Sequence, residues 1–306
     1  MARSVVRKGQ RAGALVMVGL AALGAASVAV AAERYWPPIV DPATNQHTPG
    51  RWVWADLVTS DVASAAGFYA KVFGWTFETY GGEDDRETYT LVLADGLPIG
   101  GMVFDARASK DATPSARWIG LVSVADPKAV AASVSRSGGQ VVYAPVMLGE
   151  RGETAVFRDP EGTLFGVVKS RNGDPPDYFG GVGEWAWLDL WSNDVDKAAQ
   201  FYRSVIGYET VPAGDAATTR SGVHLVSGGY VRAGIMQKRD PKTTSVWLPY
   251  VRVADAKQAA DAARAAGGRV IYEPAPLGGA VVGIIADPTG APVGIVALSA
   301  AAEARR

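Results

Sequence analysis

Two stretches of this chain are near copies of each other, and this internal repeat limits the fold more than any other feature. Residues 50–75 and 183–208 align without a gap and share two tryptophans, an Asp-Leu, an Asp-Val, an Ala pair and a Phe-Tyr pair. A repeat of this length indicates a duplicated structural unit. At 306 residues with 48% hydrophobic side chains, the chain is long enough to form two domains of ordinary size.

Each copy of the repeat begins a run of one strand, one helix and three further strands. Residues 51–58 alternate as a strand does, Asp61 suits a helix N-cap, and Gly74 ends the helix. The same order of elements recurs four times along the chain, so we predict an α+β fold of four β-α-β-β-β units in two tandem domains. The predicted boundaries are an N-terminal segment 1–32, a linker 33–49, a first domain 50–169, a linker 170–182, a second domain 183–298 and a tail 299–306.

The N-terminal segment is basic and then apolar. Residues 1–32 carry four basic side chains and no acidic one, and small residues precede Glu33. This pattern is typical of a secretory signal peptide, although the apolar run could also remain as an uncleaved membrane anchor. We therefore expect an exported protein, periplasmic or secreted, that touches the membrane only through this segment if it is not cleaved.

The charge and the cysteine content of the chain restrict the kinds of partner and site that it can have. The rest of the chain has 26 basic against 31 acidic side chains, which gives no electrostatic reason to bind nucleic acid. The absence of cysteine excludes disulfides, thiolate metal sites and cysteine nucleophiles. A small organic molecule, neutral or weakly cationic, is the expected partner, and a homodimer stays open.

The order of units, together with a short set of motifs, resembles the vicinal oxygen chelate superfamily, which includes glyoxalases, bleomycin resistance proteins and dioxygenases. The motifs are Phe68-Tyr69, Gly74-Trp75, Gly138-Gly139 and Asp159-Pro160-Glu161-Gly162, with counterparts in the second half. The resemblance implies paired units that curl into a cupped sheet, whose concave face binds a ligand. In the enzymes of that superfamily it also implies a divalent metal in the cup.

The positions that the resemblance assigns to metal ligands carry unsuitable side chains. Indole, alkyl groups and hydrogen offer no lone pair to a cation, whereas such metals need several N or O ligands. The two histidines, His47 in the first linker and His224 in a strand, do not restore a ligand set. We therefore expect no metal and no cofactor. The six positions are Trp54, Ile119 and Gly166 in the first domain and Trp187, Leu248 and Gly294 in the second.

Aromatic residues stand where the metal would be. If Trp54 faces the cup, strand alternation predicts that Trp52 and Asp56 face it as well. The expected pocket would bind a flat apolar or cationic molecule, with indoles stacking and an aspartate fixing its orientation. Asp56 and Asp189 are also the candidates for acid or base catalysis. The candidate ligand-binding residues are Trp52, Trp54, Asp56, Trp118, Trp185, Trp187, Asp189, Trp191 and Trp247.

Three functions remain compatible with these residues. The first is an exported protein that binds a small organic molecule without a metal. The second is an enzyme, a lyase, isomerase or dioxygenase, that uses unrecognised metal ligands or one of the two aspartates. The third is an interaction module whose tryptophans fill its own cups. The sequence also leaves open whether each cup forms within one domain or between the two.

Overall fold

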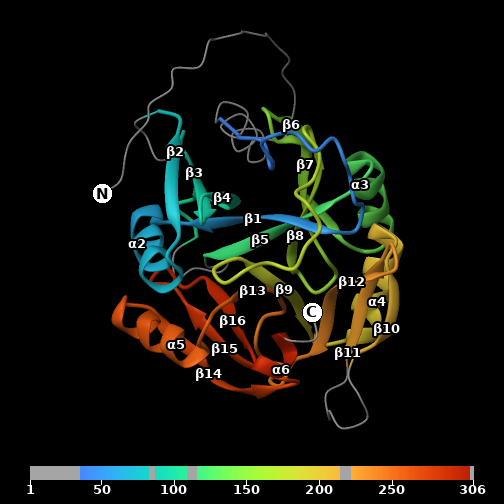
Figure 1. Ribbon diagram of the computed structural model, residues 1–306. Coiled ribbons are helices and arrows are strands. Elements are labelled where there is room, and N and C mark those ends of the chain that lie inside the picture. Colours follow the sequence, from blue (N-terminus) through green and yellow to red (C-terminus); the bar gives the residue numbers. More distant parts are fainter. Residues whose placement is uncertain (1–34, 83–86, 109–115, 214–221, 304–306) are drawn as a thin grey trace.

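The computed structural model describes residues 35–82, 87–108, 116–213 and 222–303, which form two eight-stranded mixed sheets (Figure 1). The strand orders are β2-β3-β4-β1-β5-β8-β7-β6 and β10-β11-β12-β9-β13-β16-β15-β14. The predicted α+β fold of tandem domains is confirmed. Each sheet is built from one half of the chain, so each cup forms within one domain.

The two halves use the same elements in the same order. The first contains β1 (Trp52–Thr59), α2 (Val62–Phe73), β2 (Thr76–Tyr80), β3 (Tyr89–Ala94), β4 (Leu97–Phe104), β5 (Arg117–Ser123), α3 (Pro127–Arg136), β6 (Gln140–Leu148), β7 (Gly152–Arg158) and β8 (Leu164–Ser170). The second contains β9 (Trp185–Ser192), α4 (Val195–Ile206), β10 (Glu209–Pro212), β11 (Gly222–Ser227), β12 (Tyr230–Gln237), β13 (Val246–Arg252), α5 (Ala256–Ala265), β14 (Arg269–Leu277), β15 (Ala280–Ala286), β16 (Pro292–Leu298) and the short α6 (Ala300–Glu303).

The repeated residues set the start and the end of the helices. The side chains of Asp61 and Asp194 each accept a hydrogen bond from a backbone amide of the first helical turn, which satisfies one of its free donors. Gly74 and Gly207 end the same helices in the left-handed conformation, with φ of 74° and 89°. A residue without Cβ adopts this conformation at little cost.

The two domains pack through their helix-bearing faces. Helix α2 lies against α5, and α3 lies against α4, on opposite flanks of the molecule (Figure 1). Both large hydrophobic clusters take residues from both domains: one combines β1 and α2 with α5, β15 and β16, and the other combines α3, β7 and β8 with β9 and α4. We call this side of each sheet the helix face, and the opposite side the cup.

A buried tyrosine fastens each domain to the other. The hydroxyl of Tyr202 accepts a hydrogen bond from Trp247 Nε1 at 2.7 Å and donates one to Asp159 Oδ2 of the first domain at 3.0 Å. Burial and then the neighbouring aspartate raise the pKa of Tyr202 well above its ordinary value, so the hydroxyl keeps its proton. The equivalent group is formed by Tyr69, Trp118 and Asp287.

The ends of the repeat also bond across the domains. Trp75 Nε1 donates to the carbonyl oxygen of Gly183 at 2.6 Å, and Tyr208 Oη donates to that of Gly50 at 2.6 Å. Each donor closes one copy of the repeat, and each acceptor opens the other copy. These contacts are therefore reciprocal, as expected of two similar domains related by an approximate two-fold axis.

The described residues contain no helix that is long and apolar enough to span a membrane. The predicted N-terminal segment, residues 1–32, lies outside them. The first sheet runs from residue 52 to residue 170 and the second from residue 185 to residue 298.

Loss of the Tyr202 hydroxyl should destabilise the whole protein. The substitution Tyr202→Phe leaves a buried indole N–H and a buried carboxylate short of one partner each, which should lower the free energy of unfolding by about 1–3 kcal/mol. Urea unfolding measures this change. Tyr230→Phe is the matched control, because Tyr230 is 66% exposed, and an equal loss in the two variants would contradict the role of Tyr202.

Glu161 joins the first domain to the start of helix α4. Its carboxylate accepts hydrogen bonds from Ser192 Oγ and Asp194 N, both at 3.0 Å, from Asn193 N at 3.1 Å, and from Ser245 Oγ. Burial acts to raise the pKa of Glu161, but the bonds from Ser245, Asn193 and the other donors outweigh it, and the pKa is lowered.

The Glu161 contacts predict a dependence of stability on pH. Because the pKa of Glu161 is lower in the folded protein than in the unfolded chain, its contribution is present above the unfolded value and is lost as pH falls through the folded value. Glu161→Gln should therefore cost about 1 kcal/mol near pH 7, and the difference from the native protein should shrink in acid. Urea unfolding at several pH values tests this, and a difference that stays constant with pH would disprove it.

Candidate functional site

An irregularity in the first strand of each domain reorients a tryptophan. The pairing of β1 with β5 shifts register between Trp52 and Trp54, and that of β9 with β13 shifts between the residues opposite Trp187 and Trp185. Such a shift breaks the alternation of side chains. Trp52 and Trp185 consequently pack against the core between the domains, with ring centroids 5.4 Å apart. The prediction that these two residues face the cups is wrong.

The predicted binding residues thus fall into two groups. Trp118 and Trp247 are buried on the helix face, where each donates to a tyrosine hydroxyl. With Trp52 and Trp185 they belong to the contact between the domains. The residues that lie on the cup faces are Trp54 and Asp56 in the first domain and Trp187, Asp189 and Trp191 in the second.

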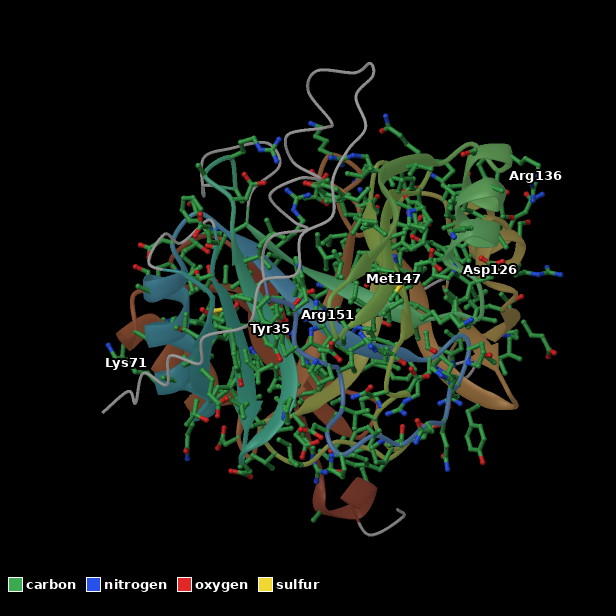
Figure 2. The ribbon with its side chains drawn as sticks, turned by 90° about the horizontal axis from the view of Figure 1, so that it is seen from above. Tyr35, Lys71, Asp126, Arg136, Met147 and Arg151 are labelled. Atoms are coloured by element: carbon green, nitrogen blue, oxygen red, sulfur yellow. The ribbon has the colours of Figure 1, made fainter. Side chains whose placement is uncertain are left out.

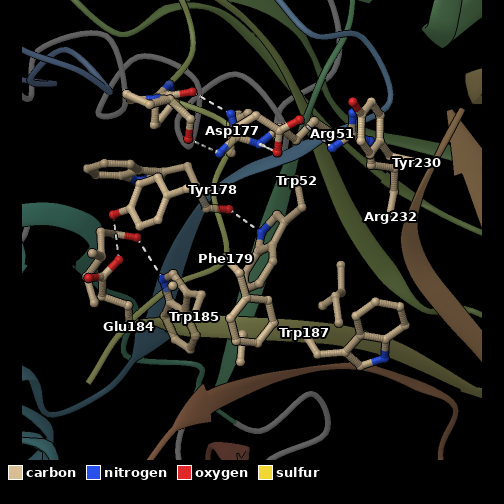
Figure 3. Close-up of a pocket in the computed structure, with 18 of the residues that line it drawn as sticks. Arg51, Trp52, Asp177, Tyr178, Phe179, Glu184, Trp185, Trp187, Tyr230 and Arg232 are labelled. Atoms are coloured by element: carbon tan, nitrogen blue, oxygen red, sulfur yellow. Dashed lines mark hydrogen bonds and ion pairs between the residues drawn. The ribbon is translucent and has the colours of Figure 1, made fainter. Parts of the chain in front are cut away.

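A cavity of about 660 Å³ lies where the two domains meet, and we call it the seam groove. Its walls are the beginnings of β1, β4, β9 and β12 and the linker that precedes β9 (Figure 3). The linker residues Tyr178 and Phe179 are 53% and 41% exposed, and Tyr230 is 66% exposed. Seven aromatic residues from both halves of the chain line it: Trp52, Trp54, Tyr178, Phe179, Trp185, Trp187 and Tyr230.

The charged groups around the seam groove neutralise one another. Arg51 forms an ion pair with Asp177 at 3.2 Å, and Arg232 pairs with the same carboxylate at 2.7 Å. Arg51 also donates to the carbonyl oxygens of Pro175 and Pro176, which fastens the linker over the groove. These contacts leave the aromatic rings as the main surface that the groove offers to a ligand.

A hydrogen bond between Tyr178 and Glu184 forms another part of the wall. Tyr178 Oη donates to Glu184 Oε2 at 2.5 Å (Figure 3). Burial and then this carboxylate raise the pKa of Tyr178 to about 12, so the phenol is neutral at ordinary pH. The carboxylate of Glu184 is already engaged by this donor, which fits the groove to a ligand without a strong charge.

The first cup is closed around a buried ion pair. Arg151 NH1 donates to Asp56 Oδ2 at 2.5 Å, and the Arg151 side chain is fully buried. Arg151 is labelled near the middle of the view in Figure 2. Tyr89 Oη and Trp54 Nε1 donate to Asp56 Oδ1 at 2.6 and 3.1 Å. The carboxylate predicted as an acid or base is therefore held between three donors.

Aromatic rings surround this guanidinium group. The Cζ atom of Arg151 lies 4.8 Å from the ring centroids of both Trp36 and Tyr89 and 5.2 Å from that of Trp54. Trp36 and Ile39 belong to the arm before β1 and are buried over the cup. Sequence reasoning missed Arg151, Tyr89 and Trp36, because an arginine in a Gly-Glu-Arg-Gly turn ordinarily indicates an exposed residue.

The second cup keeps the Trp-Asp pair but differs around it. Trp187 Nε1 donates to Asp189 Oδ1 at 2.7 Å, as Trp54 does to Asp56. By strand register, Gly222 occupies the place of Tyr89, and the turn between β14 and β15 consists of two glycines where the first domain has Gly149, Glu150 and Arg151. Trp187, Asp189 and Trp191 are half-buried, and the last two take part in further interactions.

The two histidines lie in different environments. His224 packs edge-on against Trp187 in the second cup, with ring centroids 5.8 Å apart, and burial lowers its pKa. His47 lies near Asp174 and Ser170, at 3.9 and 3.3 Å from their side-chain oxygens, between the arm and the second linker. The structure therefore does not bring the histidines together.

Two family models match this chain, one in each half. Residues 51–167 match the Glyoxalase/Bleomycin resistance protein/Dioxygenase superfamily, and residues 185–296 match a glyoxalase-like domain. The chain belongs to this superfamily. The resemblance read from the repeated motifs is confirmed.

Relatives within the superfamily match most of the chain. It is 28% identical over 253 residues to a protein of Mycobacterium tuberculosis described as "Putative glyoxylase CFP32", covering 82% of this chain and 95% of the relative. It is 27% identical over 267 residues to the anthracycline biosynthesis protein DnrV of Streptomyces peucetius, covering 83% and 95%.

Solved structures of the superfamily share the fold. The Mn(II)-bound glyoxalase from Novosphingobium aromaticivorans superposes with a TM-score of 0.56 at 16% identity, covering 82% of this chain and 83% of that one. The 2,3-dioxygenase LapB from Pseudomonas sp. KL28 gives a TM-score of 0.55 at 14% identity, covering 83% and 94%. At these identities the likeness concerns the fold alone.

The residues present do not fit the metal that the superfamily's enzymes hold. The side chains of Trp54 and Gly166 in the first cup offer no lone pair to a metal, and a metal there would meet the guanidinium of Arg151 beside Asp56. Across the described ranges, no three His, Cys, Asp or Glu side chains are close enough to hold an ion.

The two aspartates predict unequal effects on stability. Asp56→Asn leaves the guanidinium of Arg151 buried without its counter-charge, which should cost about 3–5 kcal/mol in the free energy of unfolding. The matched change Asp189→Asn, in the half-buried second cup, should cost less. Urea unfolding of both variants measures the difference, and equal costs would show that burial of the ion pair is not decisive.

Proposed function

We propose that this protein binds a small, flat, largely apolar organic molecule in the seam groove, without a metal ion. The observation that carries this proposal is a cavity of about 660 Å³ lined by aromatic side chains from both domains. Ligand pockets of small molecules commonly have volumes of about 300–1,000 Å³ and lie at domain interfaces.

The chemistry of the walls favours an aromatic ligand. Offset or edge-on contacts between rings add to the free energy gained by burying their apolar surface. Phe179 and Tyr230 present exposed rings in the groove, and the indoles of Trp52 and Trp187 also line it (Figure 3). Among the relatives, two proteins are named for anthracycline biosynthesis, which supports a ligand with fused rings.

The proposed site of action is outside the cytoplasm. The basic start and apolar run of residues 1–32 support export, and the absence of cysteine is compatible with either side of the membrane. Binding without chemistry, rather than catalysis, is favoured because the carboxylates of Asp177 and Glu184 at the groove are both engaged by donors of the protein.

Quenching of tryptophan fluorescence by a planar probe tests the proposal. Dihydroxyanthraquinone should quench the protein saturably, also after dialysis against EDTA. Phe179→Ala and Tyr230→Ala should each weaken binding about tenfold, because each removes one ring from the groove.

Tyr35→Ala is the control variant, because Tyr35 is a comparably exposed aromatic residue outside the groove, at 44% exposure. It should bind the probe as the native protein does. Absence of saturable quenching, or equal affinity in all three variants, would refute the groove as the site, and loss of binding after EDTA treatment would refute independence from metal.

A further inference from the structure

We propose that the first cup is a binding site for a planar organic cation of the guanidinium class, and that the chain fills it with its own Arg151. Of the residues that form this site, only Trp54 also lines the seam groove. The first cup would then act as a receptor with a built-in ligand rather than as an empty or solid part of the fold.

The contacts of Arg151 are those of a recognised ligand. NH1 donates to Asp56 Oδ2 at 2.5 Å, and NH2 donates to Tyr89 Oη. The three rings of Trp36, Trp54 and Tyr89 lie within 5.2 Å of the guanidinium carbon. A carboxylate combined with several aromatic faces is the usual way in which proteins bind organic cations.

The electrostatics of the site require a cation. Asp56 is 9% exposed, and a carboxylate at this depth is costly unless a positive charge balances it. Burial acts to lower the pKa of Arg151, but the charge of Asp56 and the contact with Tyr89 outweigh it, so the guanidinium stays charged. Tyr89 stays protonated and donates to the same carboxylate, because burial raises its pKa well above the ordinary value.

Arg151 reaches the cup from the short turn between β6 and β7, and the arm before β1 covers it. Arg151 ends the turn that joins β6 to β7, where its backbone N–H donates to the carbonyl oxygen of Leu148 at 2.9 Å. The carbonyl oxygen of Trp36 accepts a bond from Glu150 N at 3.1 Å, so the arm is fixed to this same turn. Removal of one side chain would therefore leave the carboxylate and the rings in place.

One donor of the occupant finds no acceptor in the site. Arg151 Nε is buried and has no hydrogen-bond partner among the described residues. A free guanidinium carries the same donors but is not held by a side-chain stem, so it can turn to use them. An external cation loses translational and rotational freedom on binding, which the tethered Arg151 does not, so we expect it to bind only at millimolar concentration.

The experiment is chemical rescue of Arg151→Ala. This substitution removes the atoms that correspond to ethylguanidinium, which should bind the variant saturably at millimolar concentration and raise its Tm by on the order of 3 °C. Ethylurea, which is planar but neutral, should have at least about a tenfold weaker effect. The native protein should respond to neither compound, because Arg151 occupies the site.

The double variant Asp56→Asn/Arg151→Ala separates recognition from general stabilisation. It keeps the rings but lacks the carboxylate, so ethylguanidinium should no longer raise its Tm. An equal response to ethylguanidinium and ethylurea, an equal response of the double variant, or no response of the folded single variant would each overturn the proposal.

The test also holds if Arg151→Ala does not fold by itself. In that case the denatured variant is refolded in ethylguanidinium or in ethylurea, and near-UV circular dichroism reports the recovery of aromatic packing. Recovery in ethylguanidinium alone supports the site, and recovery in both compounds or in neither overturns it.

Discussion

The buried tyrosine of each repeat is the contact on which the rest of the structure depends. Tyr202 and its counterpart Tyr69 each receive an indole N–H from their own domain and face an aspartate of the other. The helices of both domains are sealed in cores that the two domains share, so neither sheet covers its helix face alone. A change at either tyrosine thus affects both domains. The repeated Phe-Tyr pair therefore serves the packing of the two domains.

Because the helix faces are buried between the domains, differences between the two domains are expected on their cups, at the seam groove and on the exposed surface. The repeat supplies the same Trp-Asp pair to both cups. What distinguishes the first cup comes from segments outside the repeated stretch: the arm with Trp36, strand β3 with Tyr89, and a turn that is one residue longer and carries Arg151. A buried carboxylate and guanidinium are stable only when their remaining lone pairs and protons find partners. Tyr89 and Trp54 supply most of these hydrogen-bond partners to Asp56 and Arg151.

The sequence was sufficient for the parts of the fold that depend on local signals. The caps at Asp61 and Asp194 and the stops at Gly74 and Gly207 fix the helices, and the repeat fixes the number of units. The side of the sheet on which the Trp52 side chain lies was not predictable. Strand alternation assumes regular pairing, and the register shift between Trp52 and Trp54 arises from the pairing of β1 with β5. The role of Arg151 was hidden for a related reason, since contact with Asp56 depends on residues 95 positions apart.

The same irregularity that moved the tryptophans out of the cups also gives the seam groove its shape. By turning Trp52 and Trp185 toward the helix face, the shifts in β1 and β9 place two indoles at the boundary of the domains instead of in either cup. These rings pack against the shared core and at the same time line the groove. A molecule in the groove would consequently touch both domains through residues that also hold them together. Binding in the groove would therefore be coupled to the packing of one domain on the other, whereas binding confined to a single cup would not be.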